Sequence, residues 1–230
     1  MRVLTIMGTA NKGNTRAVVD LFLKEFEDDK SEFDEVILPN DFQNFCQGCA
    51  NCILKGEDKC PHFKEVNKIV EKIEKADLII LATPVFVGSC TGGMKAFLDH
   101  LAYMWLVHRP NENMFNKVGL IVTSAGGSGV KQTVKLLKNN LFYWGVPKIY
   151  NYGITTMKMG GNYVDYKDKY DNLDSIIENL FDATRPIVDY GEHEQCTGKK
   201  GLYKTTAYKF VELSCPTGIC KEVCIALYTN

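Results

Sequence analysis

Short apolar runs alternate along this chain with segments whose apolar residues recur at helical spacing. Such runs favour strands that are buried on both faces, as in a parallel sheet. Strands that alternate with helices require right-handed crossovers between parallel neighbours. Five strand–helix units are too few for a closed eight-stranded barrel, so the sequence predicts an open, doubly wound, five-stranded α/β sheet. The expected strands are 3–7, 34–38, 78–82, 118–122 and 148–155.

The helices between and after these strands are expected to be amphipathic, each with one apolar face against the sheet. A long irregular stretch, 41–61, separates the second strand from its helix, and the helical periodicity weakens after Arg185. We therefore expect a domain over 1–185 and a C-terminal extension over 186–230. The apolar helix faces are expected within 18–26, 63–73, 94–105, 130–141 and 173–181.

The turn from the first strand into the first helix has the composition of a phosphate-binding loop. Two glycines allow a tight turn, and short polar side chains surround them. The helix that follows offers backbone N–H groups and the positive end of its dipole to an anion. An ordinary capped turn is the alternative. The residues expected to contact the phosphate are Gly8, Thr9, Asn11, Lys12, Asn14 and Thr15.

This loop departs from the two common nucleotide-binding motifs. Gly8 and Gly13 have the spacing of a nucleoside-triphosphate loop, but Asn14 stands where that loop needs a lysine. The dinucleotide pattern Gly-x-Gly-x-x-Gly is also missing. A neutral loop rich in hydroxyl and amide groups suits a phosphomonoester that is held and not transferred.

Two further loops follow the third and fourth strands, and the carboxyl ends of parallel strands meet at one edge of a sheet. Residues 83–88 are apolar with one aromatic ring, whereas 123–129 are rich in glycine and hydroxyl groups. Together the three loops suit a ligand with a phosphate at one end and a flat, partly polar ring at the other, such as FMN. The residues expected near the ring are Pro84, Val85, Phe86, Val87, Gly88, Thr123, Ser124, Ala125, Gly126 and Gly127.

Several motifs, in order, resemble the flavodoxin-like NADPH-dependent FMN reductases, and in particular their iron–sulfur flavoprotein branch. They are Gly8-Thr9 with Gly13-Asn14-Thr15, the TPVFVG loop at 83–88, the MKAFLDH segment at 94–100 and the glycine-rich loop at 123–129. The resemblance implies non-covalent FMN, hydride donation from NADH or NADPH, an unidentified electron acceptor, and a homodimer or homotetramer. Phe86, Val87 and His100 depart from the family pattern, which has tyrosine, a larger aromatic residue and arginine there.

Four cysteines within the irregular stretch, Cys46, Cys49, Cys52 and Cys60, have the spacing Cys-x2-Cys-x2-Cys-x7-Cys. Thiolates this close can surround one metal centre, and four of them suit a [4Fe–4S] cluster. The resemblance implies that such a cluster exchanges electrons with FMN. Tetrahedral zinc and a metal-free loop are the alternatives.

Composition limits the remaining possibilities. The net charge of −1 gives no indication of nucleic-acid or membrane binding, and no apolar run approaches the length of a membrane span. The first strand begins almost at once, so we expect no signal peptide and a cytoplasmic protein. Nine cysteines are then unsuited to a disulfide scaffold. The remaining cysteines are expected to be small buried side chains: Cys90, Cys196, Cys215, Cys220 and Cys224.

The sequence leaves three functional classes open. The first is an NAD(P)H-dependent flavin oxidoreductase, the second a flavodoxin-like electron carrier, and the third a metal-binding regulatory module. Small electron carriers are strongly acidic and this chain is not, which favours the oxidoreductase. The scattered histidines, His62, His100, His108 and His193, show no catalytic pattern and are expected on the surface or in the core.

Overall fold

The computed structural model describes residues 1–28, 30–106, 111–156 and 175–180. Its centre is a five-stranded sheet in which every neighbouring pair is parallel. The strand order β2-β1-β3-β4-β5 reverses direction at β1, which is the doubly wound order of flavodoxin-like proteins. The predicted fold class is confirmed. The strands are β1 Arg2–Met7, β2 Glu32–Ile37, β3 Leu78–Pro84, β4 Val118–Ala125 and β5 Lys148–Thr155.

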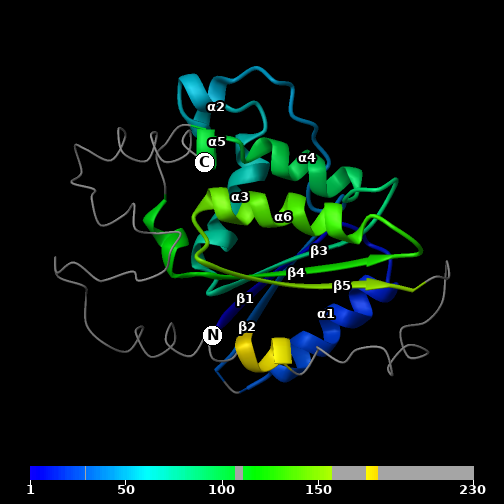
Figure 1. Cartoon of the computed structure of the whole chain (residues 1–230). Coiled ribbons are helices and arrows are strands. Elements are labelled where there is room, and N and C mark those ends of the chain that lie inside the picture. The colour runs from blue at the N-terminus through cyan, green and yellow to red at the C-terminus, as the bar shows by residue number, and fades with distance from the viewer. Residues whose placement is uncertain (29, 107–110, 157–174, 181–230) are drawn as a thin grey trace, which may run out of the picture.

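Helices cover both faces of the sheet (Figure 1). Helix α1 and the helical residues 175–180 pack on one face, whereas α3, α4 and α6 pack on the other. The α-helices are α1 Asn14–Glu25, α2 Asn51–Leu54, α3 Phe63–Lys75, α4 Gly92–His100, α5 Tyr103–Leu106 and α6 Val130–Trp144, with short 3-10 turns η1 Glu57–Lys59 and η2 Glu112–Asn116. Within the described ranges, no helix is long and apolar enough to cross a membrane.

Strand β3 shows why the sequence reads as continuous apolar runs. Its alternate residues Ile79 and Leu81 enter the core beneath α3, α4 and α6, while Leu78 and Ile80 enter the core beneath α1. All four are fully buried. A strand that is covered on both faces has no polar side, so its sequence loses the alternation of a half-exposed strand.

The structure differs from the expected elements mainly at their ends. Strand β2 is shifted toward the N-terminus, although Leu38 beyond its end still donates its N–H to the carbonyl of Met7 at 2.7 Å. The helix expected within 94–105 is broken into α4 and α5, and the irregular stretch 41–61 contains α2 and η1. Strands β3 and β4 reach beyond their predicted ends, to Pro84 and Ala125.

Part of the expected C-terminal helix is present at residues 175–180, where Leu180 is buried in the α1 side of the core. Leu173 and Phe181, which belong to the same expected helix, lie outside the described residues. So do the boundary at 185, the extension 186–230 with its four cysteines, His108 and His193.

Candidate functional site

The carboxyl ends of β1, β3 and β4 bring the three predicted loops to one edge of the sheet. In the register of the sheet, Met7 of β1 pairs with Ala82 of β3, and Pro84 of β3 pairs with Ser124 of β4. Backbone hydrogen bonds continue just beyond the strands, from Gly8 N–H to the Ala82 carbonyl and from Val85 N–H to the Ser124 carbonyl, both at 2.7 Å. The strand order reverses between β1 and β3, so this edge is the switch point where doubly wound sheets bind ligands.

The first loop ends in a helix N-terminus that has no acidic side chain. Gly13 caps α1 without a side-chain hydrogen bond, and the first turn contains no acidic residue. Thr9 Oγ1 accepts a hydrogen bond from the Asn11 N–H at 3.1 Å, which curls the loop around this end. Thr15 is buried, and its hydroxyl lies 2.7 Å from that of Ser124 in the third loop. The helix end therefore keeps its preference for an anion.

Two buried polar atoms at this edge find no hydrogen-bond partner among the described residues: Asn14 Oδ1 at the start of α1 and Thr123 Oγ1 near the end of β4. Leaving such an atom unpaired costs about 1–3 kcal/mol, so native structures supply a partner. An amide oxygen needs a donor, whereas a hydroxyl can donate or accept. Thr123 faces α6 whereas Asn14 begins α1 on the other face of the sheet, so only Asn14 Oδ1 lies beside the helix end, where it needs a donor from a ligand.

The residue Thr91, just before α4, holds the first loop in place. Thr91 Oγ1 donates a 2.6 Å hydrogen bond to the carbonyl of Gly8, and the Thr91 N–H donates to Thr83 Oγ1 at 3.1 Å. A Cβ on Gly8 would lie only 2.7 Å from Thr83 Oγ1 and 2.8 Å from Thr91 Oγ1. Gly8 is therefore required by close packing. Sequence analysis did not identify Thr91, because nothing local marks its contact with the loop.

The second loop forms a tight turn that projects apolar side chains. Phe86 and Ser89 exchange backbone hydrogen bonds of 2.8 and 3.2 Å across Val87 and Gly88. Both turn residues have positive φ, 50° at Val87 and 76° at Gly88. The side chains of Phe86 and Val87 are exposed. A β-branched residue rarely adopts this conformation, and such strain concentrates at functional sites.

The third loop packs closely against the second. A Cβ on Gly129 would lie 2.6 Å from Val85 Cγ1, and Gly129 has a φ of 101°. Thr123, Ser124 and Ala125 are buried at the end of β4, whereas Gly126 and Gly127 are exposed at the tip. The glycines of the third loop thus allow it to approach the second loop closely, and they leave an open surface beside the two loops.

The residues predicted to bind FMN therefore lie at or near one edge of the sheet, and their solvent exposure differs. On the first loop Gly8 and Thr15 are buried, Thr9 and Asn14 are half-buried, and Asn11 and Lys12 are exposed. On the second loop Pro84 and Val85 are half-buried and Gly88 is exposed with Phe86 and Val87. Whether each one contacts a ligand stays a prediction.

The cysteine loop lies on the α3–α4 side of the sheet, where α2 stands beside α5 (Figure 1). Cys46 and Cys49 are exposed, Cys52 and Cys60 are half-buried, and none of the described cysteines forms a disulfide. Burial raises the pKa of the Cys52 thiol, and the neighbouring Cys60, Cys46 and Cys49 raise it further. The other three thiols are thus near enough to Cys52 to influence its charge, and whether all four bind one metal centre stays a prediction.

Left-handed backbone on both sides of Cys49 produces the sharp curl of this loop. Gly48 has a φ of 66° and Ala50 a φ of 55°, and α2 begins directly after Ala50. Cys60 follows η1 at the other end of the loop. Short turns at both ends allow thiols from different turns to face a common centre, as a metal cluster requires.

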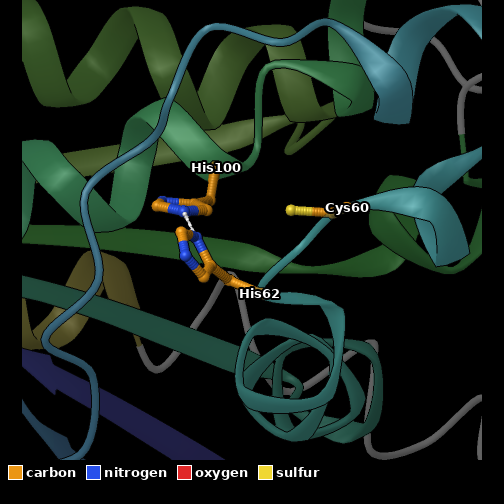
Figure 2. A group of neighbouring side chains, drawn as sticks. All are labelled: Cys60, His62 and His100. Atoms are coloured by element: carbon orange, nitrogen blue, oxygen red, sulfur yellow. Dashed lines mark hydrogen bonds between the residues drawn. The ribbon is translucent and has the colours of Figure 1, made fainter.

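A pair of histidines next to this loop was missed by sequence analysis. Figure 2 shows His62 and His100 pointing toward one another beside Cys60. His62 Nδ1 lies 2.8 Å from His100 Nε2, and His100 Nδ1 lies 2.7 Å from the Ala96 carbonyl. The rings of Phe42 and His100 pack edge to face, with their centroids 4.8 Å apart.

Burial lowers the pKa of His100, with a smaller lowering from His62, while the Ala96 carbonyl and Asp99 oppose it. His100 is 3% exposed, so of the two expected places, surface or core, it occupies the core. The pairing itself had no signal in the sequence, because the two histidines are 38 positions apart.

Comparison with known proteins agrees with the fold and the motifs. The family model described as NADPH-dependent FMN reductase matches residues 1–156. An iron-sulfur flavoprotein from Archaeoglobus fulgidus is 31% identical over 148 residues, which cover 64% of this chain and 64% of that protein. An iron-sulfur flavoprotein from Methanosarcina thermophila is 31% identical over 139 residues, covering 59% and 70%. The chain thus spans just under two thirds of the Archaeoglobus protein's length.

Among solved structures, the NAD(P)H:quinone oxidoreductase from Methanothermobacter marburgensis superposes with a TM-score of 0.57. The superposition covers 84% of this chain and 98% of that one, at 18% sequence identity. At this identity the likeness establishes the shared fold alone.

Proposed function

Because this chain belongs to the NADPH-dependent FMN reductase family, we propose that it binds FMN at the carboxyl edge of β1, β3 and β4 and passes electrons to it from NADH or NADPH. The observation that carries the proposal is the N-terminus of α1, whose first turn has no acidic residue, with the unpaired buried Asn14 Oδ1 beside it. A phosphomonoester suits the helix end, and a ribityl hydroxyl of FMN can donate to Asn14 Oδ1.

The chain's own residues bind and orient the cofactor. The backbone of 8–15 with Thr9, Asn11 and Thr15 would hold the phosphate, and the exposed Lys12 adds a positive charge nearby. The strained turn at 86–89 would offer its apolar surface to the ring. Thr91 and Thr83 keep the first loop in position through Gly8. When bound, FMN supplies the hydride acceptance and the electron release that protein side chains cannot.

We further propose that Cys46, Cys49, Cys52 and Cys60 ligate a [4Fe–4S] cluster that carries electrons toward an acceptor still to be identified. Their position on one loop, their spacing and the names of two relatives support this assignment. The fit is chemical: four thiols without disulfides, on a loop with sharp turns, are what such a cluster needs. Two other outcomes would replace the cluster assignment: zinc held by the same thiols, or a loop without metal.

We propose that residues 1–185 fold as the FMN domain, that 186–230 form an extension, and that the protein assembles as a homodimer or homotetramer. Gel filtration with light scattering tests the assembly, and limited proteolysis tests the boundary.

The experiment that tests FMN binding compares wild type with Asn14→Ala. Removing the amide should weaken FMN affinity roughly tenfold, because a ligand hydrogen bond contributes about 1–1.5 kcal/mol. Asn151→Ala, on the exposed side of the edge strand β5, is the matched control and should leave affinity unchanged. Equal affinity in all three proteins would place the FMN elsewhere.

A second measurement tests the reaction. NADH or NADPH, added without oxygen to the FMN-loaded protein, should bleach the visible flavin absorbance in stopped flow. If neither nucleotide does so while a reduced protein donor does, the chain is an electron carrier. The two experiments separate binding from turnover.

A further inference from the structure

We propose that Cys60, His62 and His100 form a mononuclear site for a borderline-soft divalent cation, best matched by Zn²⁺, and that a metal held there competes with the cluster for Cys60. The site stands on its own geometry. Only the competition rests on the proposed function, because it assumes that Cys60 is also a cluster ligand.

The three possible ligand atoms converge from two parts of the chain. Cys60 and His62 precede α3, whereas His100 ends α4, and Figure 2 shows their side chains directed into one small region. The Cys60 sulfur and one ring nitrogen of each histidine all lie within 4.8 Å of one another. Ligand atoms around tetrahedral zinc lie about 2.0–2.3 Å from the metal and therefore about 3.5 Å apart. Small rotations of the three side chains would bring these atoms to the spacing that tetrahedral zinc requires.

The hydrogen bonds of His100 orient it as a ligand. A carbonyl can only accept, so the 2.7 Å contact with Ala96 fixes the ring proton on Nδ1. The lone pair is then on Nε2, which faces His62. Metal-binding histidines typically donate their other N–H to a carbonyl or carboxylate in this way, which fixes the tautomer and the ring orientation. Packing of Phe42 against the ring restricts it further.

The donor set selects the class of metal. One thiolate and two imidazoles suit Zn²⁺, Co²⁺ and similar transition metals, whereas Mg²⁺ and Ca²⁺ prefer oxygen ligands that this set lacks. Three protein ligands leave a fourth tetrahedral position for water. On binding, the Cys60 thiol releases its proton to solvent, and the His62 proton moves from Nδ1 to Nε2 through solvent exchange. No oxidant or reductant takes part.

Sharing Cys60 makes the two metal centres alternatives. A thiolate that ligates zinc is not free to act as a terminal ligand of a [4Fe–4S] cluster, which needs four. Filling the cysteine–histidine site would therefore leave only Cys46, Cys49 and Cys52 for the cluster. We expect zinc-loaded protein to be unable to assemble a complete cluster.

The test uses full-length protein freed of metal under anaerobic conditions and titrated with Co²⁺, a spectroscopic substitute for Zn²⁺. One equivalent should bind, with visible d–d bands of a tetrahedral centre and a thiolate-to-cobalt charge-transfer band. Cys60→Ser should remove the charge-transfer band. His62→Ala should weaken Co²⁺ binding roughly tenfold or more. His62 is half-buried, so this variant avoids the folding risk of changing the buried His100.

The control variant, Cys46→Ala with Cys49→Ala, should bind Co²⁺ with an unchanged spectrum, because neither thiol belongs to the site. If its spectrum is lost while His62→Ala is unaffected, cobalt occupies the four-thiol site and the proposal is overturned. Competition is measured by iron and sulfide incorporation after loading with Zn²⁺. Loading should block incorporation in wild type and not in His62→Ala. Failure of wild type to assemble a cluster without zinc would instead contradict the proposed function.

Discussion

Val87 is a single residue whose backbone conformation conflicts with its side chain. At φ 50° its branched Cβ crowds the following carbonyl, which costs about 1–2 kcal/mol. Val87→Asn should relieve this strain, because asparagine tolerates the left-handed region. We expect the melting temperature of the FMN-free protein to rise by roughly 2–4 °C. Val87→Ile keeps the branched Cβ and should give no gain. Equal melting temperatures for Val87→Asn and Val87→Ile would show that the turn is unstrained.

Lys117 is a buried lysine at the opposite, amino-terminal edge of the sheet. Its Nζ donates to the carbonyls of Glu74 and Ala76 at 2.7 and 2.6 Å, at the C-terminal end of α3. Burial lowers the pKa of this amine from 10.5 to about 8, against the opposing effect of Asp77 and Glu74. The unfolded chain therefore binds more protons than the folded one between these two pH values.

The free energy of unfolding should therefore rise with pH across this interval. The unfavourable effect of the charged Lys117 is complete below pH 8 and disappears as the pH rises through 10.5. Relative to Lys117→Met, wild type should gain up to about 3 kcal/mol of unfolding free energy across this interval. Urea unfolding at several pH values measures the difference. A constant difference between the two proteins would mean that Lys117 has an ordinary pKa in the folded state.

What the sequence predicts at the residue scale depends on local chemistry. Asn14 and Thr15 were predicted because glycine, amide and hydroxyl groups cluster at a strand-to-helix turn. Thr91 was not, because its partner Gly8 is 83 positions away. The pairing of His62 with His100 was missed for the same reason. Contacts made only by tertiary folding leave no local pattern to read.

At the scale of elements, the strands were predicted well because burial on both faces gives continuous apolar runs. The break between α4 and α5 was not predicted. Leu101 lies at the break and Met104 follows in α5, yet both pack into the same core as α4, so the apolar spacing continues across the break. The hydrophobic pattern reports which face is buried and does not report where the backbone leaves the helix.

Thr91 joins three elements: it caps α4 through the Met94 N–H, and it bonds the end of β1 at Gly8 and the side chain of Thr83 in β3. Thr91→Val removes the hydroxyl and leaves the buried Gly8 carbonyl without this donor. We expect a loss of about 1–3 kcal/mol of unfolding free energy and weaker FMN binding. Thr91→Ser keeps the hydroxyl and should retain most of both. If valine and serine behave alike, the hydroxyl does not hold the loop.

At the scale of the whole molecule, the proposed cluster and the FMN edge must operate together. Anaerobic reconstitution of wild type should incorporate four irons and four sulfides per chain, as a [4Fe–4S] cluster requires. Cys49→Ala should incorporate less, because it lacks one ligand. Cys90→Ala is the matched control, since Cys90 is buried in the core and is not one of the four predicted ligands, and it should have no effect on the iron content. Zinc instead of iron in both wild type and His62→Ala, which lacks a ligand of the cysteine–histidine site, would contradict the cluster.

The close packing of the loops divides the ligand edge into positions that can be altered and positions that cannot, which matters for protein engineering. Gly8 and Gly129 have no room for a methyl group, so a library that randomises them would consist mostly of misfolded variants. Phe86 and Val87 point outward, and a Cβ on Gly127 meets nothing within 4 Å. Directed evolution toward new electron acceptors should therefore begin at these three outward-facing positions, where substitution leaves the scaffold intact.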